Sequence, residues 1–113
     1  MTDYQKRSDI ATVPLLLALA PPEGAAFLAF NNSTEREDGV IPIKYRALIA
    51  LGVALTTQCA YCIDVHTRQA RDHGVAKEEL AEAAFIAAAV RAGGALAHSL
   101  LALRLYEEGS KAG

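Results

Sequence analysis

Two long apolar segments with helical spacing, residues 43–57 and 77–108, place the strongest constraint on how this chain folds. Apolar residues that recur every three or four positions predict a helix with one face that has to be buried. Both segments show this spacing, and we find no convincing strand between them. We therefore expect an all-α fold, a small bundle of about six helices in a single domain that covers residues 1–113.

Proline and glycine mark the expected ends of the helices. A short helix has Pro14 in its first turn, and Pro22 opens a second helix that fades into the polar loop 31–39. Gly74 stops the helix that follows residues 43–57. In the last segment, the glycine pair at 93–94 either breaks the helix or permits close packing with another one. That segment is expected to end near Glu108.

Composition indicates self-association and argues against several classes of partner. Hydrophobic residues make up 52% of the chain, but many are alanines, Trp is absent and aromatics are only 6%. Such a core buries little area, so we expect a homo-oligomer in which neighbouring subunits cover the remaining apolar faces. A net charge of −2 with scattered basic residues argues against nucleic-acid binding. With no secretion signal and no run of about 20 uncharged residues, we expect no membrane partner and a soluble, cytoplasmic protein.

The most informative motif joins the only two cysteines, Cys59 and Cys62, to His66. On a helix that advances about 100° per residue, these three positions lie within an arc of roughly 60°. A helix that starts near Cys59 favours its thiolate, because unpaired backbone N–H groups lie beside the sulfur. His66 is one turn from Cys62 and can accept or return a thiol proton. The motif predicts a redox-active dithiol with Cys59, Cys62 and His66 as catalytic residues, and it leaves open which sulfur attacks.

Two other interpretations of the same residues remain open. The two cysteines and His66 could supply three zinc ligands, but a structural site needs a fourth, which would have to come from His73 or His98. Alternatively, both cysteines are inert and buried, as small cysteines are in alanine-rich cores. We favour the dithiol, and we expect neither a metal nor a bound cofactor.

Residues 43–74 resemble the alkyl hydroperoxidase D-like members of the carboxymuconolactone decarboxylase family. The similar pieces are Lys44-Tyr45-Arg46-Ala47-Leu48-Ile49-Ala50-Leu51, Cys59-Ala60-Tyr61-Cys62, His66, Ala70-Arg71-Asp72-His73-Gly74-Val75 and Glu78-Glu79-Leu80-Ala81-Glu82-Ala83. The resemblance extends loosely over some two-thirds of the chain, and its most specific part is the spaced Cys-Cys-His pattern.

This resemblance implies a trimeric or hexameric helical protein with thiol peroxidase or disulfide reductase activity in antioxidant defence. The matching cysteines would cycle between dithiol and disulfide, and the matching histidine would belong to a proton relay. The implied partners are a hydroperoxide substrate and a dithiol or peroxiredoxin-type electron partner.

One position departs from the pattern of the peroxidases that this chain resembles. They usually carry a glutamate twelve positions before the first cysteine, and Ala47 stands there. Another carboxylate, from Glu78, Glu79, Glu82 or a neighbouring chain, or water, would have to complete the relay. The alternatives are a family member that has lost turnover, or lactone decarboxylase-like chemistry in which Lys44, Arg46 and His66 bind and protonate a small lactone acid.

Overall fold

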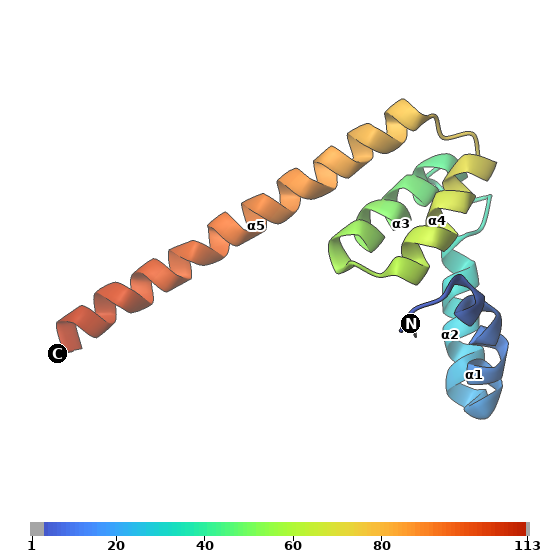
Figure 1. Cartoon of the computed structure of the whole chain (residues 1–113), viewed down its shortest axis with the longest axis horizontal. Coiled ribbons are helices and arrows are strands. Elements are labelled where there is room, and N and C mark those ends of the chain that lie inside the picture. The colour runs from blue at the N-terminus through green and yellow to red at the C-terminus, as the bar shows by residue number, and fades with distance from the viewer. Residues whose placement is uncertain (1–3, 113) are drawn as a thin grey trace.

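A computed structural model describes residues 4–112, which are helical almost throughout (Figure 1). In chain order the elements are η1 (Arg7–Thr12, a 3-10 helix), α1 (Val13–Leu19), α2 (Pro21–Thr34), α3 (Ile43–Thr57), α4 (Ala60–Asp72) and α5 (Lys77–Ala112). No strand occurs between residues 4 and 112. The expected all-α fold of about six helices is confirmed, while the expected domain 1–113 extends past the described residues at both ends.

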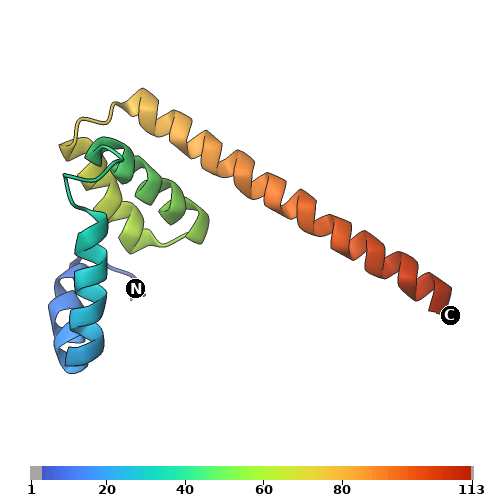
Figure 2. The ribbon, with the colours of Figure 1, turned by 180° about the vertical axis from the view of Figure 1, so that it is seen from behind.

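The helices form two antiparallel pairs and one long projecting helix. α3 and α4 lie side by side as a hairpin, and α1 and α2 form the second pair (Figures 1 and 2). The first half of α5 packs on α3, and the second half extends away from every other helix in both views. The α3–α4 hairpin is therefore the centre of the fold.

The buried core lies between the helices of this hairpin. Its apolar members are Ala47, Leu51 and Ala54 of α3, with Ala70 of α4, and Leu51 is only 2% exposed. The three α3 residues are spaced by four and three positions, so they share one face of the helix. Small alanine side chains allow close approach of the two helices, which leaves Leu51 as the largest fully buried side chain among the described residues.

The turn between α3 and α4 fixes the start of α4. Gln58 ends α3 in the left-handed conformation at φ 57°, and its N–H group donates to the Ala54 carbonyl. Cys59 is then extended and serves as the N-cap of α4. At the other end, Gly74 has φ +82°, which confirms the expected glycine stop.

Two expected boundaries were wrong. α2 continues through residues 31–34, because the Ser33 and Thr34 hydroxyl groups donate to carbonyls of the preceding turn at 2.6 and 2.7 Å and remain compatible with a helix. α5 is unbroken at Gly93 and Gly94 and continues past Glu108 to Ala112. A glycine costs a helix only about 1 kcal/mol, so two of them do not end a segment of this length.

The other helices leave much of α5 exposed. Its large apolar side chains that are more than half exposed are Phe85, Ile86, Val90, Leu96, Leu100, Leu103, Leu105 and Tyr106. The radius of gyration is 19.3 Å, whereas a compact domain of this length has about 13 Å. The chain by itself therefore leaves a long apolar surface uncovered.

By length and composition alone, the segment Lys77–Gly109 is also long and apolar enough to cross a bilayer. Arg91 lies near the middle of this segment, and its guanidinium donates to the Thr56 carbonyl at the end of α3. A charged side chain at the centre of a bilayer is costly. This bond instead anchors α5 to the hairpin.

Candidate functional site

The two cysteines meet at the first turn of α4. Their sulfur atoms lie 2.6 Å apart, and both thiols are free and partly buried. The Cys59 sulfur also accepts the Cys62 backbone N–H at 3.3 Å, which makes it the capping group of the helix. This separation lies near the 2.05 Å or so of a disulfide bond, so a two-electron oxidant could join the sulfurs, with loss of both thiol protons, after only a small side-chain movement.

The same contacts separate the acidities of the two thiols. The pKa of Cys59 is lowered, first by the hydrogen bond with the Cys62 side chain and then by the Cys62 backbone N–H. The pKa of Cys62 is raised, first by its bond with the Cys59 sulfur and then by burial. Cys59 is therefore the more acidic thiol of the pair.

His66 lies farther along α4 and does not bond to the sulfurs. Among the described residues, no hydrogen bond joins its ring to Cys59 or Cys62. Its Nδ1 atom instead lies 2.8 Å from Oε1 of Gln69, one turn along the same helix. Cys62 and His66 lie in α4 and Cys59 caps it, and the direct contact that is made is between the two sulfurs.

His66 faces a large cavity that the sequence did not reveal. The cavity has a volume of about 770 Å³ and lies between α2, the loop 35–42, α3 and α4. Apolar side chains such as Phe30 and Ile43 line much of it, and the polar groups include Glu35, Gln69 and His66. A chamber of this size and mixed lining can hold a small organic molecule.

Sequence analysis did not identify Gln69 and Glu35, which both line this cavity. Nε2 of Gln69 donates to Oε1 of Glu35 at 3.2 Å while its Oε1 contacts the His66 ring. Ala47, at the position where a relay glutamate was expected, lines the same cavity. The i,i+3 spacing of His66 and Gln69 was a readable signal, but Glu35 lies 34 positions from Gln69 in a polar run without periodicity.

A second polar cluster ties the N-terminal segment to the outer side of α4. The Tyr61 hydroxyl donates to Asp9 at 2.6 Å, and Arg7 makes two 2.8 Å bonds to Asp64. The pKa of Asp64 is lowered, mainly by the hydrogen bond from Arg7. Asp64 thus points away from the sulfurs and anchors η1.

The basic residues near the cavity are engaged by other groups. Lys44 pairs with Glu79 at 3.0 Å. Arg46 donates from Nη1 to the Thr34 carbonyl at 2.8 Å and from Nε to the Ile41 carbonyl at 2.9 Å. These bonds hold both ends of the loop 35–42. Glu79 also accepts the Ala76 N–H at the start of α5. Glu79 was one of the three acidic residues suggested for the proton relay, and these contacts give it a structural role instead.

The described residues contain no group of three or more His, Cys, Asp or Glu side chains that could hold a metal ion. His73 lines the cavity with His66, whereas His98 is exposed on α5. The donor set that zinc would require is therefore not assembled within residues 4–112 of one chain.

The fold and this dithiol geometry together define a helical protein with paired thiols at a helix N-terminus. The family model described as "Carboxymuconolactone decarboxylase family" matches residues 21–105. The chain therefore belongs to the carboxymuconolactone decarboxylase family, which includes alkyl hydroperoxidase D-type peroxidases as well as decarboxylases.

Individual relatives support the same assignment. "Uncharacterized protein 4 in cox locus" of Paracoccus denitrificans is 41% identical over 83 residues, 74% of each chain. An uncharacterized protein of Cupriavidus necator is 36% identical over 67 residues, which are 58% of this chain and 59% of that protein. A crystal structure of a Methanobacterium thermoautotrophicum protein matches with a TM-score of 0.72 and 27% identity, over 80% of this chain and 98% of the other.

Proposed function

We propose that this protein is a thiol-dependent peroxidase or disulfide reductase whose reactive centre is the Cys59–Cys62 pair. The observation that carries the proposal is the 2.6 Å approach of two free sulfurs at the start of α4. The pKa of Cys59 is lowered and that of Cys62 is raised, which favours one sulfur as the attacking thiolate and the other as the resolving thiol of a two-thiol cycle.

The proposed cycle has three balanced steps. The Cys59 thiolate attacks the terminal oxygen of a hydroperoxide, the O–O bond breaks, and a proton converts the leaving alkoxide to an alcohol. The Cys62 thiol then attacks the resulting sulfenic acid, forming the disulfide and releasing water. A protein-bound or small dithiol finally supplies two electrons and two protons to restore both thiols. The same last step, run alone, is disulfide exchange.

His66 is the proposed proton carrier of this cycle. Its position one turn from Cys62 lets the ring take the Cys62 proton during resolution, directly or through one water, and return it to the leaving oxygen. The cavity beside His66 would receive the organic part of the hydroperoxide, because much of its lining is apolar.

Lactone decarboxylation is the weaker alternative for a specific reason. That chemistry needs a cation for the substrate carboxylate, and the two candidates are occupied. Lys44 pairs with Glu79, and Arg46 holds the Thr34 and Ile41 carbonyls. An uncharged hydroperoxide requires no such group. Loss of turnover remains the non-catalytic alternative, and activity measurements decide it.

The direct test is hydroperoxide consumption with a small dithiol as reductant. We expect turnover in the natural protein, none in Cys59→Ser or Cys62→Ser, and a loss of roughly 100-fold or more in His66→Asn. His98→Asn, on the exposed face of α5, is the matched histidine control and is expected to keep full activity. Trapped sulfenic acid in Cys62→Ser would identify Cys59 as the attacking sulfur. Absence of turnover with every dithiol would contradict the proposal.

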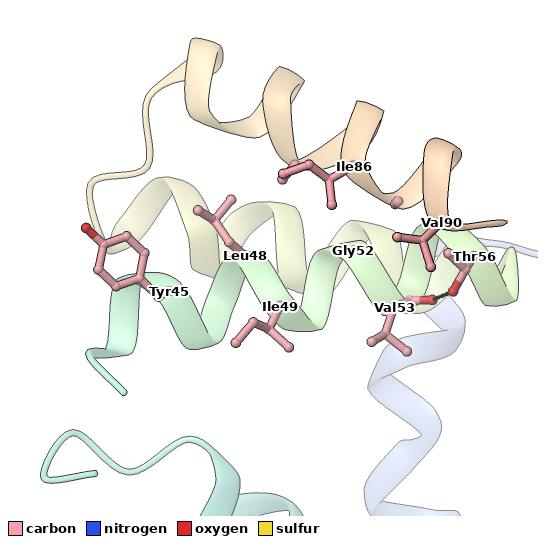
Figure 3. Close-up of a pocket in the computed structure, with 10 residues that line it drawn as sticks. Tyr45, Leu48, Ile49, Gly52, Val53, Thr56, Ile86 and Val90 are labelled. Atoms are coloured by element: carbon pink, nitrogen blue, oxygen red, sulfur yellow. Dashed lines mark hydrogen bonds between the residues drawn. The ribbon is translucent and has the colours of Figure 1, made fainter. Parts of the chain in front are cut away.

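We also propose that the active form is a homo-oligomer, a trimer or hexamer, built on α5. An apolar cavity of about 490 Å³ lies between α3 and α5, and Ile86 and Val90 point from α5 toward α3 (Figure 3). A Cβ atom at Gly52, Gly93 or Gly94 would meet nothing within 4 Å in this chain. These open positions give a second copy room for close helix packing. Mass in solution tests the proposal, and a single-chain mass would overturn it.

A further inference from the structure

The polar groups around His66 form a continuous row of hydrogen bonds between two helices. His66 and Gln69 come from α4, and Glu35 comes from the end of α2. The Nδ1–Oε1 distance is 2.8 Å and the Nε2–Oε1 distance from Gln69 to Glu35 is 3.2 Å. Both lie within ordinary hydrogen-bond range.

The donors and acceptors of the three side chains determine the direction of each hydrogen bond. An ionised carboxylate only accepts hydrogen bonds, so Glu35 requires the NH₂ group of Gln69 to point toward it. The Gln69 carbonyl oxygen then faces His66, and that oxygen also only accepts. Nδ1 of His66 must therefore carry the proton. In the neutral ring the other nitrogen, Nε2, is left as the proton acceptor.

The position of Glu35 is itself fixed by the backbone around it. Its N–H group donates to the Asn32 carbonyl as the C-cap of α2. Arg46 holds the adjacent Thr34 carbonyl and, across the loop, the Ile41 carbonyl. Gly39 lies against the Arg46 guanidinium, where any Cβ would collide with it. The carboxylate is thus presented from an anchored loop.

We propose that Glu35 and Gln69 are positioning residues that hold His66 as its Nδ1–H tautomer, with Nε2 free to accept the proton of the dithiol reaction. The catalytic role of this pair rests on the proposed function, whereas the hydrogen-bond geometry does not depend on it. Glutamine transfers no proton here. The pair takes over the orienting part of a relay in a cavity that Ala47 also lines, and the Ala47 methyl group cannot orient a histidine.

The test combines a spectroscopic reading of the tautomer with turnover. Long-range ¹⁵N–¹H spectra of histidine-labelled protein, assigned with His66→Asn, report which ring nitrogen carries the proton. We expect Nδ1–H in the natural protein and the Nε2–H form, which free imidazole side chains prefer, in Gln69→Leu. In the same variant we expect kcat to fall about 10-fold with little change in KM. Asp38→Asn, which removes a carboxylate from the same loop, is the matched control and should change neither reading.

A swap of the two side chains separates positioning from a merely structural role. Gln69→Glu alone places two carboxylates next to each other, and their repulsion should turn the new side chain away from Glu35 and His66, so that the tautomer preference is lost. Combined with Glu35→Gln, the new amide can donate to the carboxylate at position 69, which again accepts from His66 Nδ1. The double variant should regain the Nδ1–H signal and most of kcat. Failure of the double variant to regain both, with the helical content intact, would overturn the inference.

The two proposals fail in distinguishable ways. A protein that shows the Nδ1–H signal and loses it in Gln69→Leu, but turns over no hydroperoxide, supports the positioning pair and contradicts the peroxidase. A protein with dithiol-dependent turnover whose His66 carries its proton on Nε2 contradicts the positioning pair and leaves the peroxidase standing.

Discussion

The α3–α4 hairpin and the second half of α5 differ in how much of their apolar surface is buried. The hairpin buries Ala47, Leu51, Ala54 and Ala70 against its own partner helix. The second half of α5 carries equally apolar side chains and packs against no other helix among residues 4–112 (Figure 1). A single chain therefore completes the region that holds the cysteines and leaves the outer helix exposed.

Replacement of Leu100 by Asp is expected to have the largest effect, because it tests whether a second copy covers α5. Leu100 is 68% exposed in the chain. A carboxylate buried in an apolar interface would cost several kcal/mol for each copy, so the assembly should dissociate to single chains at micromolar concentration. Light scattering coupled to size exclusion measures this. Leu100→Met keeps the volume and should keep the mass, and an Asp variant of unchanged mass would contradict the α5 interface.

The core of the hairpin should respond next most strongly. Leu51→Ala removes the largest fully buried side chain and should lower the free energy of unfolding by about 3 kcal/mol. Urea denaturation at fixed protein concentration measures the change. Leu16→Ala on α1, at a position 69% exposed, is the control and should change stability by less than about 0.5 kcal/mol. Equal effects at the two sites would show that the hairpin is not the stable centre.

The two thiols should differ in their pH dependence. The lowered pKa of Cys59 means that its thiolate persists as pH falls, while the raised pKa of Cys62 keeps that group a thiol over the same range. Iodoacetamide should therefore label Cys59 first, with a rate difference of roughly 10-fold at pH 7 for each pKa unit between them. Mass spectrometry of the peptide carrying both residues measures this. Preferential labelling of Cys62 would reverse the assignment of the attacking sulfur.

The smallest effect concerns the turn that presents Cys59. Gln58 adopts the left-handed conformation, which glycine occupies without steric cost. Gln58→Gly should raise the free energy of unfolding by about 0.5 kcal/mol. Thr57→Gly, one residue earlier and still within α3, should lower it by up to about 1 kcal/mol. Chemical denaturation compares the two, and destabilisation by Gln58→Gly would show that the side chain itself holds the turn.

Sequence analysis predicted the parts of the fold that periodicity and glycine determine. The helix 43–57 follows from its apolar spacing, and Gly74 ends the next helix as expected. The pattern failed where local chemistry was ambiguous. Residues 31–34 look like a polar loop, yet their hydroxyl groups bond within a helix. The glycine pair at 93–94 left a break and close packing both open, and the helix is unbroken there.

Only the part of the candidate site that lies at α4 could be predicted from the sequence. The proximity of Cys59 and Cys62 follows from their spacing, and the capping geometry explains why Cys59 is the more acidic thiol. The contact between Gln69 and Glu35 depends on how α2 and its loop return to α4, which no local pattern encodes. The same is true of the cavity beside His66, because its walls come from three helices and a loop.

Intact-mass analysis of the protein after one equivalent of organic hydroperoxide tests the central claim, that the two sulfurs at the start of α4 exchange electrons as a pair. The account predicts that each chain loses two hydrogen atoms, that peptide mapping places the new bond between Cys59 and Cys62, and that a small dithiol restores the original mass. Thiols that remain free after the oxidant is added, or oxygen retained on one sulfur without a bond to the other, would contradict it.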